Sequence, residues 1–168
     1  MNMKIIVTLY LALFTLSSAY ATENPTNVSK MSQRFNQGMK TLNAINGAGS
    51  GEKIVQVFED VSPDLAQYAI EYGFGDLLSR KVLSVKTQEM IIIANLAALA
   101  NAKPQLKAHI NAALNVGVKQ EEIAEIMLLT SAYAGFPATI NGTLALKEVV
   151  MQRTMLEKTE ENKGEGIL

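Results

Sequence analysis

The residue best suited to acid–base chemistry is His109, the single histidine of this 168-residue chain. The sequence contains no cysteine, so histidine is the only residue type in it that exchanges protons readily near neutral pH. His109 follows Leu106 by three positions and precedes Ala113 by four, which places it on or beside the apolar face of a helix. We predict a general acid–base residue here. The alternative is a core histidine bonded to a backbone carbonyl or a carboxylate.

Carboxylates near apolar helices are the candidate partners of this histidine. Glu89 directly precedes the apolar run 90–94, at the start of a helix whose positive end favours a carboxylate. Glu122 and Glu125, one turn apart on a later helix, are interpreted as ordinary acids near a helix start. A carboxylate beside a histidine orients its ring, so we predict that Glu89 pairs with His109. One histidine with scattered carboxylates makes a poor zinc site, and no metal is predicted.

The amino-acid composition excludes several classes of function. The 48% of hydrophobic residues predict a globular chain, and 15 Lys and Arg against 16 Asp and Glu leave a net charge of −1. Such a chain has no broad positive field, so we predict no nucleic-acid partner. The lack of cysteine excludes disulfides, thiol peroxidase chemistry and Cys-ligated metals. Nucleotide, dinucleotide, zinc-protease and calcium motifs are also absent from the sequence. We therefore predict a small-molecule partner and no cofactor.

The first 21 residues have the pattern of a secretory signal peptide. Lys4 precedes the mostly apolar run 5–16, and small residues stand at Ala19 and Ala21. The alternative is a membrane anchor, but the run is too short for a hydrocarbon core of about 30 Å. We predict cleavage after Ala21, a periplasmic or secreted protein, and no membrane attachment afterwards.

The remaining sequence predicts helices, because apolar residues recur every three or four positions and alternation with period two is nearly absent. The expected elements are 28–46, 62–73, 76–80, 84–100, 104–117, 119–135 and 137–157. The run 90–100 is apolar on nearly all sides and predicts a central buried helix. The last helix carries one apolar stripe, suited to a core or a subunit interface, formed by Ile140, Leu144, Met151 and Met155.

The domain organisation follows from the same pattern. We predict an N-terminal helical arm with a glycine-rich joint over 22–52, because a polar helix there ends in the run Gly47-Ala48-Gly49-Ser50-Gly51. One helical domain is expected over 53–158, and a charged, disordered tail over 159–168.

Several segments stand in a characteristic order in the second half of the chain. They are TQEMI at 87–91 leading into AALA at 97–100, PQLKAHINAALNVGV at 104–118, EEIAEI at 121–126 and AYAGFPA at 132–138. Together they resemble the carboxymuconolactone decarboxylase family, a branch of the alkylhydroperoxidase-like fold. The resemblance implies an all-α helical bundle that assembles as a homo-oligomer.

The resemblance also implies a reaction. An acidic lactone loses a carboxylate as carbon dioxide without a thiol or cofactor, and a general acid protonates the dienolate that remains. His109 is the candidate acid, with Glu89 as its orienter or as a second proton carrier. The peroxidase branch of the fold has a CxxC pair where this chain has Ala102 and Gln105, so a thiol peroxidase is not expected.

The resemblance further implies a substrate pocket. Tyr133, Phe136 and Pro137 are expected to shape its wall, and Gln88 to contact the substrate. The resemblance implies an arginine at the position of Gln88 in many members of the family, so a positive group for a substrate carboxylate is missing there. The nearest cations in this sequence are Arg80, Lys81 and Lys86.

Two functions are compatible with these residues. The first is an exported, cofactor-independent lyase that acts on a small anionic lactone or keto acid. The alternative is a non-catalytic module on the same fold, which binds a small molecule or serves an oligomeric interaction. Turnover of a bound ligand would separate the two.

Overall fold

The computed structural model describes residues 25–165, and the side chains of 33–160. The described elements are α2 (Pro25–Asn46), α3 (Ser50–Phe58), α4 (Pro63–Tyr68), the π-helix η2 (Ala69–Leu77), α5 (Val85–Leu99), α6 (Lys103–Asn115) and α7 (Gln120–Glu165). Residues 25–165 contain no strand, which confirms the all-α prediction. The signal peptide predicted for 1–21 lies outside the described residues.

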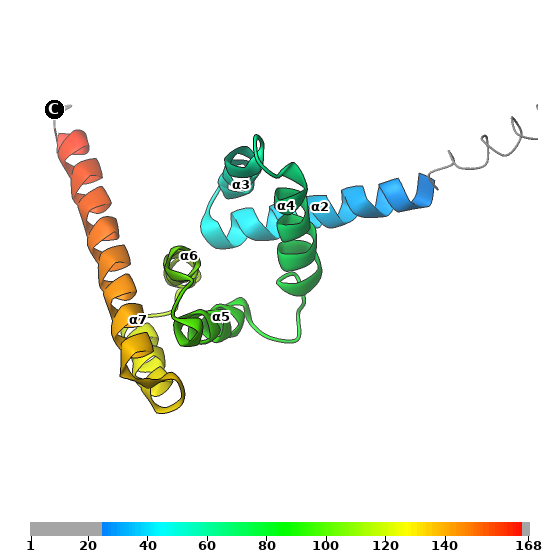
Figure 1. The fold of residues 1–168 in the computed structure, drawn as a ribbon. Helices are drawn as coiled ribbons and strands as arrows, with labels where there is room; N and C mark the ends of the chain where they lie inside the picture. The colour runs from blue at the N-terminus through cyan, green and yellow to red at the C-terminus, as the bar shows by residue number, and fades with distance from the viewer. Residues whose placement is uncertain (1–24, 166–168) are drawn as a thin grey trace, which may run out of the picture.

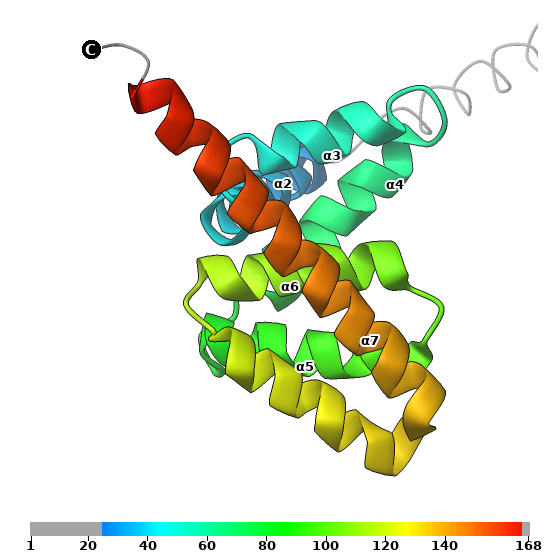
Figure 2. The ribbon, with the colours of Figure 1, turned by 90° about the vertical axis from the view of Figure 1, so that its left-hand side faces the viewer.

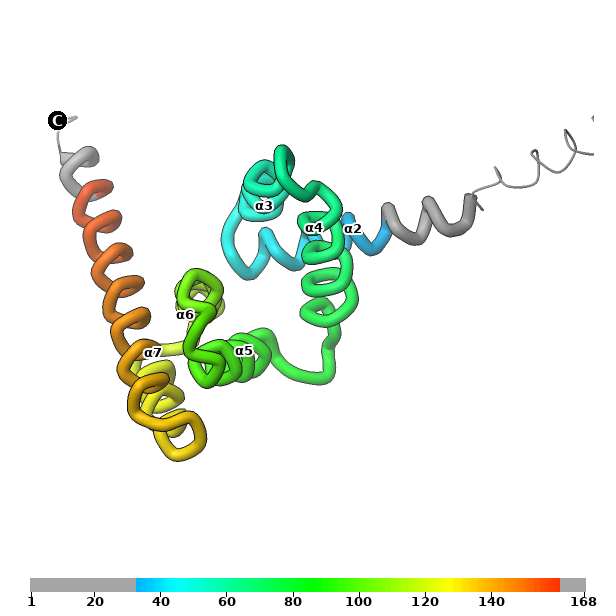
Figure 3. Tube along the Cα trace, in the orientation of Figure 1, coloured from blue at the N-terminus to red at the C-terminus, as the bar shows by residue number. Residues whose placement is uncertain are grey.

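The helices form two groups (Figure 1). The first contains α2, α3, α4 and η2, and the second contains α5, α6 and α7. The chain passes between them through the segment 78–84, and α2 also contacts α6. The Cα trace shows α7 on the side of α5 and α6 that faces away from η2 (Figure 3). One face of α5 is therefore directed toward η2 and another toward α7.

α2 and η2 cross at very short range because each carries a glycine at the crossing. A Cβ atom on Gly38 would lie 2.1 Å from the carbonyl oxygen of Ile70, and one on Gly75 would lie 2.6 Å from that of Arg34. The Asp76 carboxylate accepts two hydrogen bonds from the Arg34 guanidinium, which raise the pKa of Arg34. The predicted N-terminal arm is thus packed against η2 over its described side chains.

Helix boundaries follow local signals in part. Ser84 precedes α5, and its hydroxyl accepts a hydrogen bond from the backbone N–H of Thr87 at 3.1 Å, as an N-cap does. Ser62 precedes α4, but its side chain makes no capping hydrogen bond. The predicted helix end near Gly73 is wrong, because the chain continues as η2 through Leu77. This continuation joins two elements that the sequence suggested were separate.

α7 is bent at Gly135 (Figure 2). The φ of 80° and ψ of 170° at this residue are not helical, and a residue with a Cβ adopts them only under strain. This confirms the predicted break before Pro137. The helix continues through Glu165, where the sequence suggested a disordered tail from 159. By length and composition, Gln120–Glu160 could cross a membrane, and in this structure α7 packs against α5 and α6.

The principal core lies among α5, α6 and α7. Its buried members are Ile93, Ala97, Leu106, Ile110, Ala113, Val118, Ile123, Ile126, Met127, Ala145, Leu146 and Val149. They include Leu106, Ile110 and Ala113 of α6 and Ile123, Ile126 and Met127 of α7. The core thus fixes α6 against α5, which positions the residues described below.

The predicted burial of 90–100 is wrong in part, whereas the stripe of the last helix lies outside the core and its alternative place at a subunit interface stays a prediction. Ile91 and Leu99 on α5 are exposed, so this helix is not buried on all sides. The apolar stripe of the last helix is also exposed, at Ile140, Leu144, Met151 and Met155. The reason is geometric: small residues of α7, among them Gly142 and Ala145, face the core instead.

Candidate active site

His109 on α6 and Glu89 on α5 form a hydrogen-bonded pair. Nδ1 of His109 lies 2.8 Å from Oε2 of Glu89. The Glu89 side chain is 0% exposed, whereas that of His109 is 22% exposed. The two residues meet because α5 and α6 pack against each other. The structure therefore brings together the histidine and the carboxylate that the sequence suggested as partners.

This pairing orients the imidazole ring. A buried carboxylate needs a hydrogen-bond donor, and the Nδ1–H group of His109 supplies one. The second oxygen of Glu89, Oε1, is buried without a hydrogen-bond partner. Within residues 33–160, Nε2 of His109 has no protein partner. Nε2 is thus the nitrogen that can exchange a proton with a ligand.

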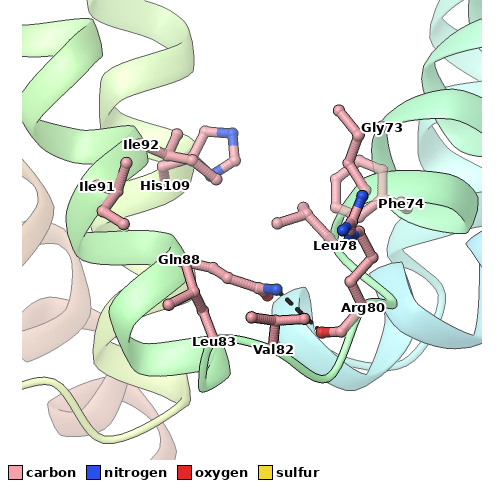
Figure 4. A pocket seen from close by; sticks show the side chains of 11 residues that line it. Gly73, Phe74, Leu78, Arg80, Val82, Leu83, Gln88, Ile91, Ile92 and His109 are labelled. Carbon is pink, nitrogen blue, oxygen red and sulfur yellow. Dashed lines mark hydrogen bonds between the residues drawn. The ribbon is translucent and has the colours of Figure 1, made fainter.

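His109 faces a pocket between the two helix groups (Figure 4). The pocket has a volume of about 540 Å³, within the range of small-molecule sites. Its lining is Gly73, Phe74 and Leu77 of η2, Leu78, Arg80, Val82 and Leu83 of the connecting segment, Gln88, Ile91 and Ile92 of α5, and His109 of α6. Most of these side chains are apolar, so the few polar groups define how a ligand is oriented.

Gln88 lines this pocket, where the sequence suggested a substrate contact. Its Nε2 donates a hydrogen bond to the carbonyl oxygen of Arg80 at 3.1 Å. Its Oε1 is buried and has no hydrogen-bond partner. Gln88 therefore connects the first turns of α5 to the segment that precedes the helix.

Tyr133, Phe136 and Pro137 do not line this pocket, which corrects the expectation that they form its wall. They lie around the bend of α7, where Tyr133 is 94% exposed and Phe136 is 72% exposed. The physical reason is that α7 covers the side of α5 and α6 that faces away from η2 (Figure 1).

The actual wall was not recognised in the sequence. Phe74, Leu77, Leu78 and Val82 belong to η2 and the segment after it. The available signal was the density of apolar residues within 74–83, a stretch that lies close before Glu89 in the sequence. A π-helix also has no simple sequence pattern, although π-helical turns are frequent at functional sites.

Potential metal ligands do not cluster in the described part of the chain, where no group of three or more acidic or histidine side chains could hold an ion. The pocket instead presents an imidazole, an amide and a guanidinium. These groups can transfer a proton, bind an oxygen and bind an anion, respectively.

Comparison with known proteins identifies one family and several relatives. The sequence profile of the carboxymuconolactone decarboxylase family matches residues 63–148. The 4-carboxymuconolactone decarboxylase of Acinetobacter baylyi is 28% identical over 131 residues, which cover 78% of this chain and 96% of that protein.

Two further relatives are matched over shorter stretches. Peroxisomal protein 2 of Schizosaccharomyces pombe is 33% identical over 73 residues, which cover 43% of this chain and 34% of that protein. An uncharacterized 15.0 kDa protein of Paracoccus denitrificans is 31% identical over 85 residues, which cover 50% of this chain and 63% of that protein.

Proposed function

The chain belongs to the carboxymuconolactone decarboxylase family, and we propose that it is a cofactor-independent lyase acting on a small anionic lactone or keto acid. One observation carries this proposal: the buried Glu89 carboxylate holds the imidazole of His109 at the wall of an apolar pocket. The similarity to the Acinetobacter decarboxylase over most of both chains supports the same reaction class.

The proposed reaction is a decarboxylation followed by a proton transfer. The bond between the substrate carboxylate and its ring carbon breaks, carbon dioxide leaves, and the electron pair remains as a dienolate. Nε2 of His109 donates a proton to carbon, and the ring regains a proton from water. Glu89 keeps the ring oriented and stabilises its protonated form through Nδ1.

The test uses His109→Asn, because an Asn side chain can place an amide donor near the position of Nδ1. This variant retains a hydrogen bond to the buried Glu89 carboxylate and removes the transferable proton. With 4-carboxymuconolactone as the probe, we expect wild-type carbon dioxide release and a fall in kcat of about 10²-fold to 10⁴-fold in the variant. Circular dichroism and urea unfolding would show whether the fold is retained.

The matched control is Lys107→Gln, which lies on the same helix, does not line the pocket and pairs with Glu148 at 3.2 Å. Turnover by this control should equal that of the wild type. Undiminished turnover by His109→Asn would contradict the proposed role of the histidine.

The second candidate function is a non-catalytic binding module. Gln88 favours it, because this chain has an uncharged amide beside Glu89, where the resemblance implies an arginine in many members of the family. Recovery of the lactone unchanged after long incubation with a wild-type protein that binds it would support this candidate over the lyase.

We also propose that the chain is exported before it acts, on the pattern of residues 1–21. Intact mass spectrometry of the protein purified from its own host should then show a chain that begins at Thr22. A chain that retains the first 21 residues would contradict export by signal cleavage.

A further inference from the structure

We propose that Arg80 is the residue that binds the carboxylate of the substrate in this pocket. The inference rests on the proposed function, because it assumes an anionic ligand close to His109. The positive charge that binds the substrate would then come from Arg80, in the segment 78–84 that connects η2 to α5, because Gln88 carries no charge.

The position of Arg80 carries the first part of the argument. Arg80 and His109 line the same pocket, one from the segment after η2 and the other from α6. Figure 4 shows the two side chains on facing walls, with the guanidinium near Phe74 and the imidazole near Ile92. A ligand that spans the pocket can therefore contact both groups.

The neighbouring cations are placed elsewhere. Nζ of Lys86 donates a hydrogen bond to the carbonyl oxygen of Gly117 at 2.7 Å, away from the pocket. Lys81 lines a second cavity, between α2 and the connecting segment, which Arg80 also lines, and it is absent from the pocket of His109. Of the three cations close to Glu89 in sequence, Arg80 is the one that lines the pocket of His109.

The Arg80 guanidinium is free to bind a ligand. Among the side chains of residues 33–160, no ion pair or hydrogen bond engages it. This differs from Arg34, whose guanidinium binds Asp76. An arginine without an acidic partner beside an apolar wall is suited to a carboxylate, which it can bind through two parallel hydrogen bonds.

The backbone of Arg80 is fixed by hydrogen bonds, whereas its guanidinium makes none within the described residues. Its N–H donates to the carbonyl oxygen of Leu77 at 3.2 Å, and its own carbonyl oxygen accepts from Gln88 at 3.1 Å. These two hydrogen bonds fix the position of the Arg80 backbone, and therefore of its Cα atom, relative to η2 and α5. Gln88 thus assists the proposed anchor through the backbone, although it carries no charge.

This arrangement also indicates which carboxylate Arg80 binds. Hydrogen bonds from a guanidinium stabilise a carboxylate in the ground state, which opposes its loss as carbon dioxide. Arg80 is therefore expected to hold a carboxylate that stays on the molecule.

The experiment compares an acid with its neutral ester. The probes are 5-oxooxolane-3-carboxylate and its methyl ester, bound to the full chain and followed by the NMR signals of the single histidine and by calorimetry. We expect the wild type to bind the acid about tenfold more tightly than the ester, as one charge-assisted hydrogen-bonded contact implies. Arg80→Gln should abolish this preference and leave the affinity for the ester unchanged.

The matched control is Lys81→Gln, which removes the same charge from the adjacent residue outside the pocket. It should retain the preference for the acid. Equal loss in both variants would show a long-range charge effect and overturn the assignment of Arg80.

The outcomes separate this inference from the proposed function. An acid that shifts the histidine signals equally in wild type and Arg80→Gln overturns the anchor and leaves the lyase proposal standing. Preference for the acid that depends on Arg80, without carbon dioxide release from 4-carboxymuconolactone, supports the anchor and contradicts the lyase. If neither probe shifts the histidine signals in the wild type, the assignment of Arg80 fails, and carbon dioxide release from 4-carboxymuconolactone decides the lyase proposal separately.

Discussion

Glu89 is a fully buried carboxylate with one hydrogen-bonded oxygen and one oxygen without a partner. Structural carboxylates in protein interiors are usually satisfied by several donors. A carboxylate directed at a single imidazole is instead typical of acid–base pairs, in which the acid sets the orientation and tautomer of the ring. This geometry supports the acid–base role proposed for the pair.

Glu89→Gln tests this interpretation at the residue scale. The amide has the same size and can still accept a hydrogen bond from Nδ1, but it cannot stabilise a protonated ring. We expect kcat to fall by about 10²-fold, while the free energy of unfolding changes by less than about 1 kcal/mol because a buried charge is also removed.

Turnover assays and urea unfolding would measure both effects, with Glu125→Gln on the exposed surface of α7 as the control. A Glu89→Gln variant as active as this control would show that the carboxylate has no part in proton transfer.

At the scale of elements, the pocket depends on the crossing of α2 and η2. η2 contributes three residues to the pocket wall, and its buried glycine faces α2. The close approach of the two backbones leaves no room for a Cβ atom at Gly38 or Gly75. The N-terminal helix therefore supports the wall of the pocket without lining it.

Gly38→Ala should destabilise the protein by about 1–3 kcal/mol, because the added methyl group would overlap the carbonyl of Ile70. The matched control is Gly73→Ala in η2, since a Cβ atom at that position meets nothing within 4 Å. Urea midpoints of the two variants would give the comparison. If Gly38→Ala were as stable as the wild type, α2 and η2 could move apart with little loss of stability, which would contradict the prediction.

At the scale of the whole molecule, α7 exposes an apolar face that one chain does not cover. Its members include Leu128, Leu129, Tyr133, Phe136, Ile140, Leu144, Met151 and Met155. Exposed apolar patches of this kind mark interaction surfaces in soluble proteins. The homo-oligomer expected from the sequence resemblance would bury this face between copies.

Light scattering of the wild type should therefore give a mass that is a multiple of that of one chain, 18.2 kDa before any cleavage. Phe136→Lys should shift this mass toward that of one chain, because a buried lysine is strongly unfavourable at an apolar contact. Lys147→Gln, at an exposed position of the same helix, is the control. A wild type that remains monomeric at high concentration would contradict the prediction.

The helical class, most of the helix boundaries and the pairing of His109 with Glu89 were predictable from the sequence. These features depend on local signals. Apolar periodicity predicts helices, Ser84 caps the start of α5, and Gly135 breaks α7 because of its backbone freedom. His109 and Glu89 could be selected because the chain offers one histidine and one acid at the start of an apolar helix.

The residues that surround this pair follow from the packing of the helices and were not predictable from the sequence. η2 and the segment after it face His109, whereas the bend of α7 lies on the other side of α5 and α6. The same packing leaves the stripe of α7 exposed and brings Arg80 into the pocket in place of Lys81 or Lys86. These outcomes depend on contacts between residues far apart in sequence, which helical periodicity does not encode.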